Sequence, residues 1–274
     1  MPTLPRNAEP IEVTAMSYTK IARFEPFGPE GRLQRLKDFN ASILETDQPV
    51  QRGHLYIDDG EHGFSAGVWD CTPFTTILRP YPFNEFMLIV EGSVTIAEPG
   101  GRETAIHAGE TFIIPKGLNC QWKQTGYLRK YYAIFDGAPG QQPVNHAALQ
   151  VVRPDPEGDQ QDVAAPPAEL LLTPAPVQYA REWFADATGQ LTAGAWDTTA
   201  YHRKPIPFPR HELLHVLAGY VALTDEAGKA NSFAAGDTFL VPLGTVCDWK
   251  CSEYTRMVYC AFRPKTEAER IQAG

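Results

Sequence analysis

Two glutamates, Glu85 and Glu212, are the residues of this sequence best suited to acid/base chemistry. Each lies in a short, largely apolar segment with the composition of a β-strand. A carboxylate in such a segment needs a partner of opposite charge or a polar cavity. Two interpretations follow. The glutamate forms a structural ion pair, with Arg129 or Arg256 as its partner, or it lines a pocket and transfers a proton.

The two glutamates are related by an internal duplication. When the chain is shifted against itself by 127 residues, segments 46–135 and 173–262 align without a gap. The aligned identities include Trp69 with Trp196, Pro82 with Pro209, Gly92 with Gly219, Cys120 with Cys247 and Trp122 with Trp249. Neither half contains short tandem units, which indicates a duplicated domain and not a solenoid. The breaker residues between the halves predict an N-terminal domain at 16–138, a Pro/Gly-rich linker at 139–167 and a C-terminal domain at 168–264.

The elements that must position these residues are mostly strands. Short β-prone segments separated by turns predict an all-β sandwich or barrel. Residues 98–102 and 225–229 are matched hairpin turns, and 111–115 and 238–242 are matched strands that end at proline. We expect one short helix, over residues 29–40.

Alternation along a strand assigns side chains to faces. Glu85, Met87 and Ile89 share one face, and Phe86 and Leu88 share the other. Both faces are apolar, so we expect this strand to be covered on both sides.

Residues 211–215 read His-Glu-Leu-Leu-His, a pattern that binds zinc when it lies on a helix. The duplication aligns this segment with the strand that contains Glu85. On a strand, His211 and His215 lie on the face opposite Glu212, which separates the would-be ligands from the base. We therefore expect no metalloprotease chemistry. The two histidines are either satisfied at an interface or bind a metal there.

Cys120 and Cys247 recur at one position of the duplication. Such residues are small buried side chains, or they serve as a ligand or as a reactive thiol. The chain has five cysteines and no Cys-x-x-Cys pair, and it has no apolar leader segment at its start. We therefore expect reduced thiols and a cytoplasmic protein.

The charge balance bears on the choice of partners. The chain has 24 Lys and Arg against 33 Asp and Glu, a net charge of −9. This balance disfavours nucleic acid, which requires a basic surface. Apolar runs such as Phe86–Val90 are far shorter than the ~20 residues of a membrane span. We expect a small-molecule ligand and a homodimer, with no nucleic acid and no membrane as partner.

The spacing of several residues resembles the cupin superfamily. Glu85 and Gly92 have the spacing that ends the first cupin motif, and Gly109, Pro115, Gly117 and Cys120 have the spacing of the second. Segments such as Gly67-Val-Trp69 and Asn84-Glu85-Phe86 are similar to the cupin-3 subfamily, which is related to ureidoglycine aminohydrolase. The resemblance implies two tandem cupin barrels, each a jelly roll or double-stranded β-helix.

The same resemblance identifies the positions at which cupins hold a metal. Metal-binding cupins use two histidines and a glutamate of the first motif and a histidine of the second. The corresponding residues here are Arg79, Tyr81, Glu85 and Cys120 in the first copy and Ile206, Phe208, Glu212 and Cys247 in the second. An arginine at a ligand position repels a cation. We expect no metal cofactor and keep a divalent transition metal with atypical ligands as the alternative.

By analogy with cupin barrels, the first copy offers the better pocket. Glu85 and Tyr81 are the candidate catalytic residues, which together could move a proton. The candidate substrate-binding residues are Trp69, Arg79, Cys120, Trp122, Trp196, Glu212, Cys247 and Trp249. The leading interpretation is a bicupin that binds an organic acid or a carbohydrate-like metabolite and acts as a metal-independent isomerase, cyclase or lyase. The alternatives are a metal-dependent enzyme similar to ureidoglycine aminohydrolase and a non-catalytic sensor or scaffold.

Overall fold

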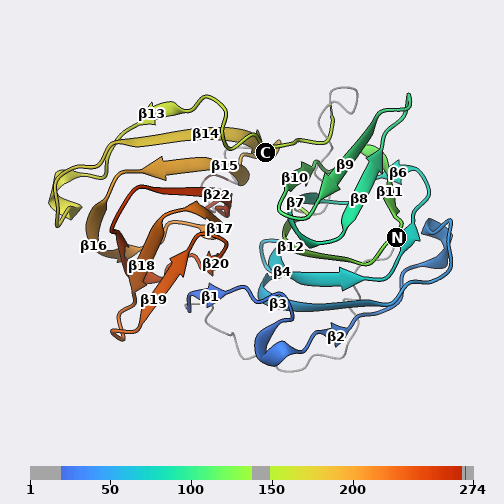
Figure 1. Cartoon of the computed structure of the whole chain (residues 1–274), viewed down its shortest axis with the longest axis horizontal. Helices are drawn as coiled ribbons and strands as arrows, with labels where there is room; N and C mark the ends of the chain where they lie inside the picture. Colours follow the sequence, from blue (N-terminus) through green and yellow to red (C-terminus); the bar gives the residue numbers. More distant parts are fainter. Residues whose placement is uncertain (1–19, 138–148, 267–268, 270–274) are drawn as a thin grey trace. The chain divides into compact units, whose positions relative to one another are not determined.

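The computed structural model describes residues 20–137, 149–266 and 269, and its strands form two units (Figure 1). Of the described residues, 25–137 and 149–153 belong to the first unit, and 20–24 and 154–266 belong to the second. This division differs from the boundaries expected at 16–138, 139–167 and 168–264. Of those segments, 16–19 and 139–148 lie outside the described residues.

In its described part, the first unit consists of two antiparallel sheets. One has the strand order β10-β7-β12-β4-β3-β2, and the other has the order β5-β11-β8-β9, with β6 paired to β11. The strands are β2 (Gln34–Arg35), β3 (Gln51–Asp59), β4 (Phe64–Cys71), β5 (Phe74–Thr75), β6 (Arg79–Pro80), β7 (Asn84–Glu91), β8 (Ser93–Ala97), β9 (Glu103–His107), β10 (Thr111–Ile114), β11 (Asn119–Gln124) and β12 (Leu128–Phe135).

The second unit repeats this arrangement. Its sheets have the orders β1-β20-β17-β22-β15-β14-β13 and β16-β21-β18-β19. The strands are β1 (Ala22–Arg23), β13 (Gln161–Val163), β14 (Gln178–Ala185), β15 (Leu191–Thr198), β16 (Tyr201–Pro207), β17 (His211–Ala218), β18 (Tyr220–Thr224), β19 (Ala230–Ala234), β20 (Thr238–Val241), β21 (Val246–Cys251) and β22 (Thr255–Phe262). The matched strands and hairpin turns expected from the duplication are confirmed.

The core of each unit lies between its two sheets. In the first unit, Met87 and Ile89 of one sheet pack in the same cluster as Ile96 and Trp122 of the other. The face that alternation assigned to Met87 and Ile89 is therefore the inner one. Burial of each such side chain contributes about 1.5–3 kcal/mol, which favours the packed pair of sheets.

The β7–β8 and β17–β18 connections require glycine. Gly92 has a φ of 84° and Gly219 a φ of 80°. A Cβ on either would lie 2.1 Å from a backbone oxygen, that of Tyr127 or Tyr254. The glycine that ends the apolar strand in each copy therefore allows the backbone of the next turn to approach closely.

Each unit also receives an edge segment from outside the duplicated region. In the second unit, β1 pairs with β20, so that Ala22 lies opposite Leu240. In the first unit, Val152 forms a bridge with Ile113, the equivalent of Leu240. Residues near position 22 were expected in the N-terminal domain, but their backbone completes the edge of β20.

The prediction of a helix over residues 29–40 is wrong. This segment contains a 3-10 turn at Pro29–Gly31 and the strand β2. Gly28 and Gly31 both have a φ of 70°, and Glu30 has a φ of 62°. This left-handed backbone is incompatible with a continuing helix.

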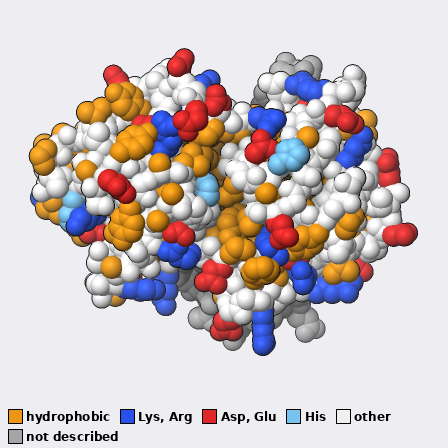
Figure 2. Space-filling view, in the orientation of Figure 1, with side chains coloured by type: hydrophobic (Ala, Val, Ile, Leu, Met, Phe, Trp, Pro, Cys, Tyr) orange, Lys and Arg blue, Asp and Glu red, His pale blue; other side chains and the backbone are white. Residues whose placement is uncertain are grey.

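No helix within the described residues is long and apolar enough to cross a membrane. On the face drawn in Figure 2, acidic and basic side chains are interspersed among hydrophobic ones.

Candidate functional site

Glu85 lies on the inner face of the first unit and accepts bonds from two side chains. It is the second residue of β7 and is only 2% exposed. The Tyr81 hydroxyl donates a hydrogen bond to its Oε2. The Lys130 ammonium lies 2.8 Å from its Oε1 and 3.2 Å from the sulfur of Met87. A carboxylate with a donor on each oxygen satisfies the requirement for a buried charge.

Lys130 is also enclosed by aromatic rings. Its ammonium lies 4.9 Å from the ring centroid of Trp69 and 4.8 Å from that of Trp122. These distances are typical of cation–π contacts. The two indoles are edge to face, with their centroids 6.4 Å apart, and Phe74 stacks on Trp122 at 6.2 Å. The ion pair therefore lies in an aromatic box between the two sheets.

No motif in the sequence identified Lys130 as a site residue. Residues of β12 alternate, and Lys130 lies opposite Ile89 just as Tyr132 lies opposite Met87. Alternation from Glu85 therefore places Lys130, and not Arg129, on the inner face. The expectation that Arg129 pairs with Glu85 is therefore wrong, because Arg129 lies on the opposite face of β12 from Lys130.

Arg79, Tyr81 and Cys120 lie beside this cluster. In the pairing of β6 with β11, Arg79 is opposite Cys120. Burial is the main cause that raises the pKa of the Tyr81 hydroxyl well above its usual value, and the negative charge of the adjacent Glu85 adds to the shift. The positive charge of Arg79 partly opposes it. Burial raises the pKa of the Cys120 thiol to about 12. Tyr81 is therefore a protonated donor, and Cys120 is a neutral thiol at ordinary pH.

The second unit has different residues at the equivalent positions. Glu212 is paired with Arg210, whose Nη2 lies 2.8 Å from Oε1. Phe208 replaces Tyr81, and Met257 replaces Lys130. The partner expected for Glu212, Arg256, is therefore also wrong. The second unit therefore keeps the glutamate but lacks the hydroxyl that Tyr81 and the ammonium that Lys130 supply in the first.

The other second-unit candidates pack in an aromatic cluster. The rings of Trp196 and Trp249 are 6.0 Å apart, and the ring of Trp196 lies 6.4 Å from that of Tyr201. The indole nitrogen of Trp249 donates to Sγ of Cys251. Burial raises the pKa of the Cys247 thiol to about 11.

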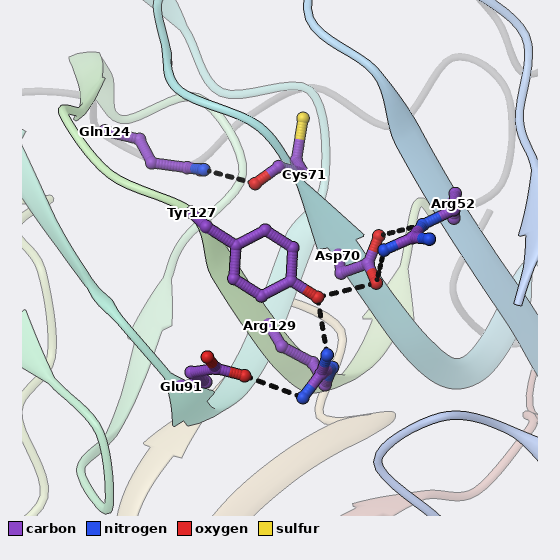
Figure 3. Close-up of polar contacts among 7 residues, drawn as sticks. All are labelled: Arg52, Asp70, Cys71, Glu91, Gln124, Tyr127 and Arg129. Carbon is purple, nitrogen blue, oxygen red and sulfur yellow. Dashed lines mark hydrogen bonds and ion pairs between the residues drawn. The ribbon is translucent and has the colours of Figure 1, made fainter. Parts of the chain in front are cut away.

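Arg129 and Arg256 belong to a polar network that occurs in both units. In the first, Arg52 forms two 2.9 Å bonds to Asp70, and the hydroxyl of Tyr127 donates to Asp70 (Figure 3). Arg129 donates to Tyr127 and to Glu91. Asp70 follows Trp69 on β4, so alternation places it on the opposite face from the aromatic box. The network ties strands together on that outer face.

The same outer network in the second unit contains the equivalents of three of these residues. Tyr254 donates to Asp197 at 2.8 Å, and Arg256 lies 3.1 Å from the same carboxylate. Arg256 also pairs with Glu157 at 2.7 Å. The repetition of Asp, Tyr and Arg indicates a structural role inherited from the duplication.

The His-Glu-Leu-Leu-His segment lies on β17, as expected. Nδ1 of His211 accepts a hydrogen bond from the Leu243 backbone, and Nδ1 of His215 lies 2.9 Å from the hydroxyl of Thr238. Burial lowers the pKa of His215. The segment is therefore not the helical zinc motif.

The residues at the cupin ligand positions do not fit a metal ion. At the ligand positions of the first unit, Glu85 and Cys120 supply one carboxylate and one neutral thiol, and Lys130 and Arg79 contribute positive charge. In the second, Ile206 and Phe208 have no donor atoms. Over all described residues, no group of three or more His, Cys, Asp and Glu side chains is arranged to hold a metal. Transition metals require such donors.

Comparison with known families agrees with this fold. The family model for the EutQ-like cupin domain, Cupin_3, matches residues 59–132 and 185–259, one region in each unit. The chain belongs to the EutQ-like cupin family. It is therefore a bicupin with two tandem jelly-roll domains, and the resemblance based on the motif spacing is confirmed.

Several solved structures are similar in fold. A protein of unknown function of the DUF861 family from Pseudomonas syringae pv. tomato is 24% identical, with a TM-score of 0.69 over 77% of this chain and 85% of that one. A cupin 2 conserved barrel domain protein from Leptotrichia buccalis is 12% identical, with a TM-score of 0.51 over 84% and 98%. Protein Ylba from E. coli, also of DUF861, is 10% identical, with a TM-score of 0.51 over 91% and 94%. A comparison with curated proteins found no match.

Proposed function

We propose that the first cupin domain is a metal-independent acid/base site for a small organic acid or a carbohydrate-like metabolite. The observation that carries this proposal is the buried carboxylate of Glu85, held between the hydroxyl of Tyr81 and the ammonium of Lys130. The reaction class is proton transfer at carbon, as in an isomerase, a cyclase or a lyase.

Each residue of this cluster has a distinct role. Glu85 is the base that takes a proton from the carbon next to a carbonyl. Tyr81 retains its proton because its pKa is raised, and its hydroxyl serves as the acid. The positive charge of Lys130 stabilises the negative charge that develops on the substrate oxygen.

Substrate binding uses the residues around the cluster. Arg79 lies near Tyr81 and Cys120 and carries a guanidinium that binds a carboxylate through two parallel hydrogen bonds. The indoles of Trp69 and Trp122 provide flat apolar walls. The guanidinium of Arg79 favours an anionic substrate.

Solvent deuterium exchange tests the proposal directly. The protein is incubated in D2O with pyruvate, 2-oxoglutarate and glucuronate, and deuterium incorporation next to the carbonyl is followed by NMR. We expect exchange above the protein-free rate with at least one probe, and a loss of about 100-fold or more in Glu85→Gln. The control Glu103→Gln removes an exposed carboxylate of β9 that pairs with Lys123.

Three results would contradict the proposal. Equal exchange by Glu85→Gln and the unmodified protein removes Glu85 as the base. Activity that a chelator abolishes and a divalent metal restores supports the metal-dependent alternative. Thermal stabilisation by a probe that never exchanges supports a binding protein without catalysis.

A further inference from the structure

Lys130 is a buried primary amine with a base beside it. Among the lysines that the structure describes, it is the one that is buried. Its ammonium lies 2.8 Å from Oε1 of Glu85 and 3.2 Å from the sulfur of Met87. A lysine in apolar surroundings acts as a nucleophile when an adjacent group takes its proton, because the neutral amine adds to a carbonyl carbon. The carboxylate of Glu85 is placed to take that proton.

Solvent reaches Lys130 although it lies on the inner face of the first domain. On the same face, Met87 and Ile96 are 0% exposed, whereas 8% of the Lys130 side chain is exposed. Arg79 and Tyr81, at the other side of the cluster, are only partly buried. The cluster therefore continues from the amine to residues that reach the surface of the domain.

The second domain shows that the fold does not require an amine at this position. Met257 is the equivalent of Lys130, and the guanidinium of Arg210 neutralises Glu212. A guanidinium stays charged, whereas a primary amine that loses a proton can form an imine with a carbonyl group. The first domain therefore neutralises its inner glutamate with the kind of cation that can also react.

We propose that Lys130 forms an imine with the keto carbon of a 2-oxo acid in the first cupin domain. This inference rests on the function proposed for that domain and names its substrate class. The amine requires a keto group, and the guanidinium of Arg79 suits the carboxylate next to it. A hydrogen on the carbon at the other side of the keto group is the one that Glu85 removes.

The step balances in atoms and charge. Glu85 takes one proton from the ammonium, the nitrogen lone pair bonds to the keto carbon, and the keto oxygen takes that proton and becomes a hydroxyl. A second proton passes from the nitrogen through Glu85 to the hydroxyl, which leaves as water as the C–O bond breaks and the C=N bond forms. The products are a protonated imine, one water molecule and the Glu85 carboxylate.

Proton transfer at carbon follows from the imine. Glu85 removes the hydrogen from the neighbouring carbon, and the electron pair of that C–H bond moves toward the positively charged nitrogen to give an enamine. The positive charge of Lys130 thus still stabilises the electrons released from carbon, now through a covalent bond.

Reductive trapping tests the imine in the unmodified protein. The protein is treated with sodium borohydride and pyruvate, 2-oxobutyrate or 2-oxoglutarate, and the label is located by mass spectrometry of peptides. We expect Lys130 to gain the mass of the oxo acid less one oxygen atom. We expect it to be labelled at least about tenfold faster than Lys229, an exposed lysine. Lactate, which has a hydroxyl in place of the keto group, should give no label.

Two variants accompany this experiment. Lys130→Arg retains a positive charge beside Glu85 but removes the amine, so the label should be lost. Lys123→Arg changes a lysine of β11 that pairs with Glu103, and labelling of Lys130 should be unchanged. If Lys130→Arg does not fold by near-UV circular dichroism, the position of the label in the unmodified protein decides.

The outcomes separate this inference from the proposed function. Absence of label on Lys130 with all three oxo acids, or equal labelling of Lys130 and Lys229, would overturn the imine. Deuterium exchange without trapping would also reject the imine and leave the acid/base function of Glu85 in place. Trapping on Lys130 without exchange would support the imine and contradict the proposed proton transfer.

Discussion

The ammonium of Lys130 lies 2.8 Å from Oε1 of Glu85, on the inner face of the first domain. The duplication places a methionine, Met257, at the equivalent position of the second domain. The two domains therefore neutralise the inner glutamate with different cations. The first pairs Glu85 with a cation from the neighbouring strand β12, and the second pairs Glu212 with Arg210, two residues earlier in the chain.

Replacing Lys130 by methionine should destabilise the first domain by about 3–5 kcal/mol, because it leaves the Glu85 carboxylate buried without a cation. The double variant Lys130→Met/Glu85→Met should recover most of this loss. Hydrogen exchange of peptides from β7 and β12 measures the opening free energy of this domain separately from that of the second.

The matched control is Lys123→Met, which breaks an exposed pair of 2.7 Å between Lys123 and Glu103 in the same domain. Exposed pairs contribute about 0–1 kcal/mol. Equal effects of Lys130→Met and Lys123→Met would show that the buried ion pair does not stabilise the domain.

The duplication and the strand alternation predicted most of the fold. A match over residues 46–135 and 173–262 identifies two copies because equivalent side chains occupy equivalent positions in both cores. The edge strand β1 could not be predicted in the same way. Its pairing with β20 depends on a backbone contact between residues distant in the sequence, and two residues carry no periodic pattern.

One contact of the candidate site joins two residues that were named together from the sequence: the Tyr81 hydroxyl donates a hydrogen bond to Glu85. Lys130 was missed because it follows Arg129, and the sequence alone does not fix which of two adjacent cations faces inward. Pairing of β12 with β7 settles that question through the register of Lys130 with Ile89.

Acid should destabilise the second domain through His215. Burial lowers the pKa of this imidazole in the folded state below its unfolded value of about 6.5. The unfolded chain therefore binds the proton more tightly, so this contribution to stability is present above about pH 6.5 and is lost as the pH falls. In His215→Gln, the decrease in stability between about pH 7 and pH 5 should be smaller. Hydrogen exchange of peptides from β17 measures it.

His107→Gln provides the control for this pH dependence, because His107 is an exposed residue of β9. We expect it to follow the unmodified protein at every pH. If His215→Gln also follows the unmodified protein, proton binding by His215 is not coupled to unfolding.

The cysteines should be unreactive in the folded protein. All five are buried, and burial raises the pKa of Cys71 and Cys120 to about 12 and that of Cys247 and Cys251 to about 11. Because the thiolate is the reactive form, Ellman's reagent at about pH 8 should label none within minutes and all of them in denaturant. Ser252→Cys, at an exposed position, is the positive control. Rapid labelling of Cys120 in the native protein would indicate an activated thiol.

The stability lost on replacing Gly92 by alanine should exceed that lost at Gly100, a glycine of similar φ with open space around it. Gly92 has a φ of 84° and Gly100 a φ of 88°. A Cβ at Gly92 would lie 2.1 Å from the backbone oxygen of Tyr127, whereas a Cβ at Gly100 would meet nothing within 4 Å. Gly100→Ala should therefore cost only the left-handed strain of about 1–2 kcal/mol. Gly92→Ala should cost several kcal/mol more, because a backbone atom must move. Hydrogen exchange of β7 and β12 peptides compares the two variants, and equal losses would show that the β7–β8 turn can shift to accept a side chain.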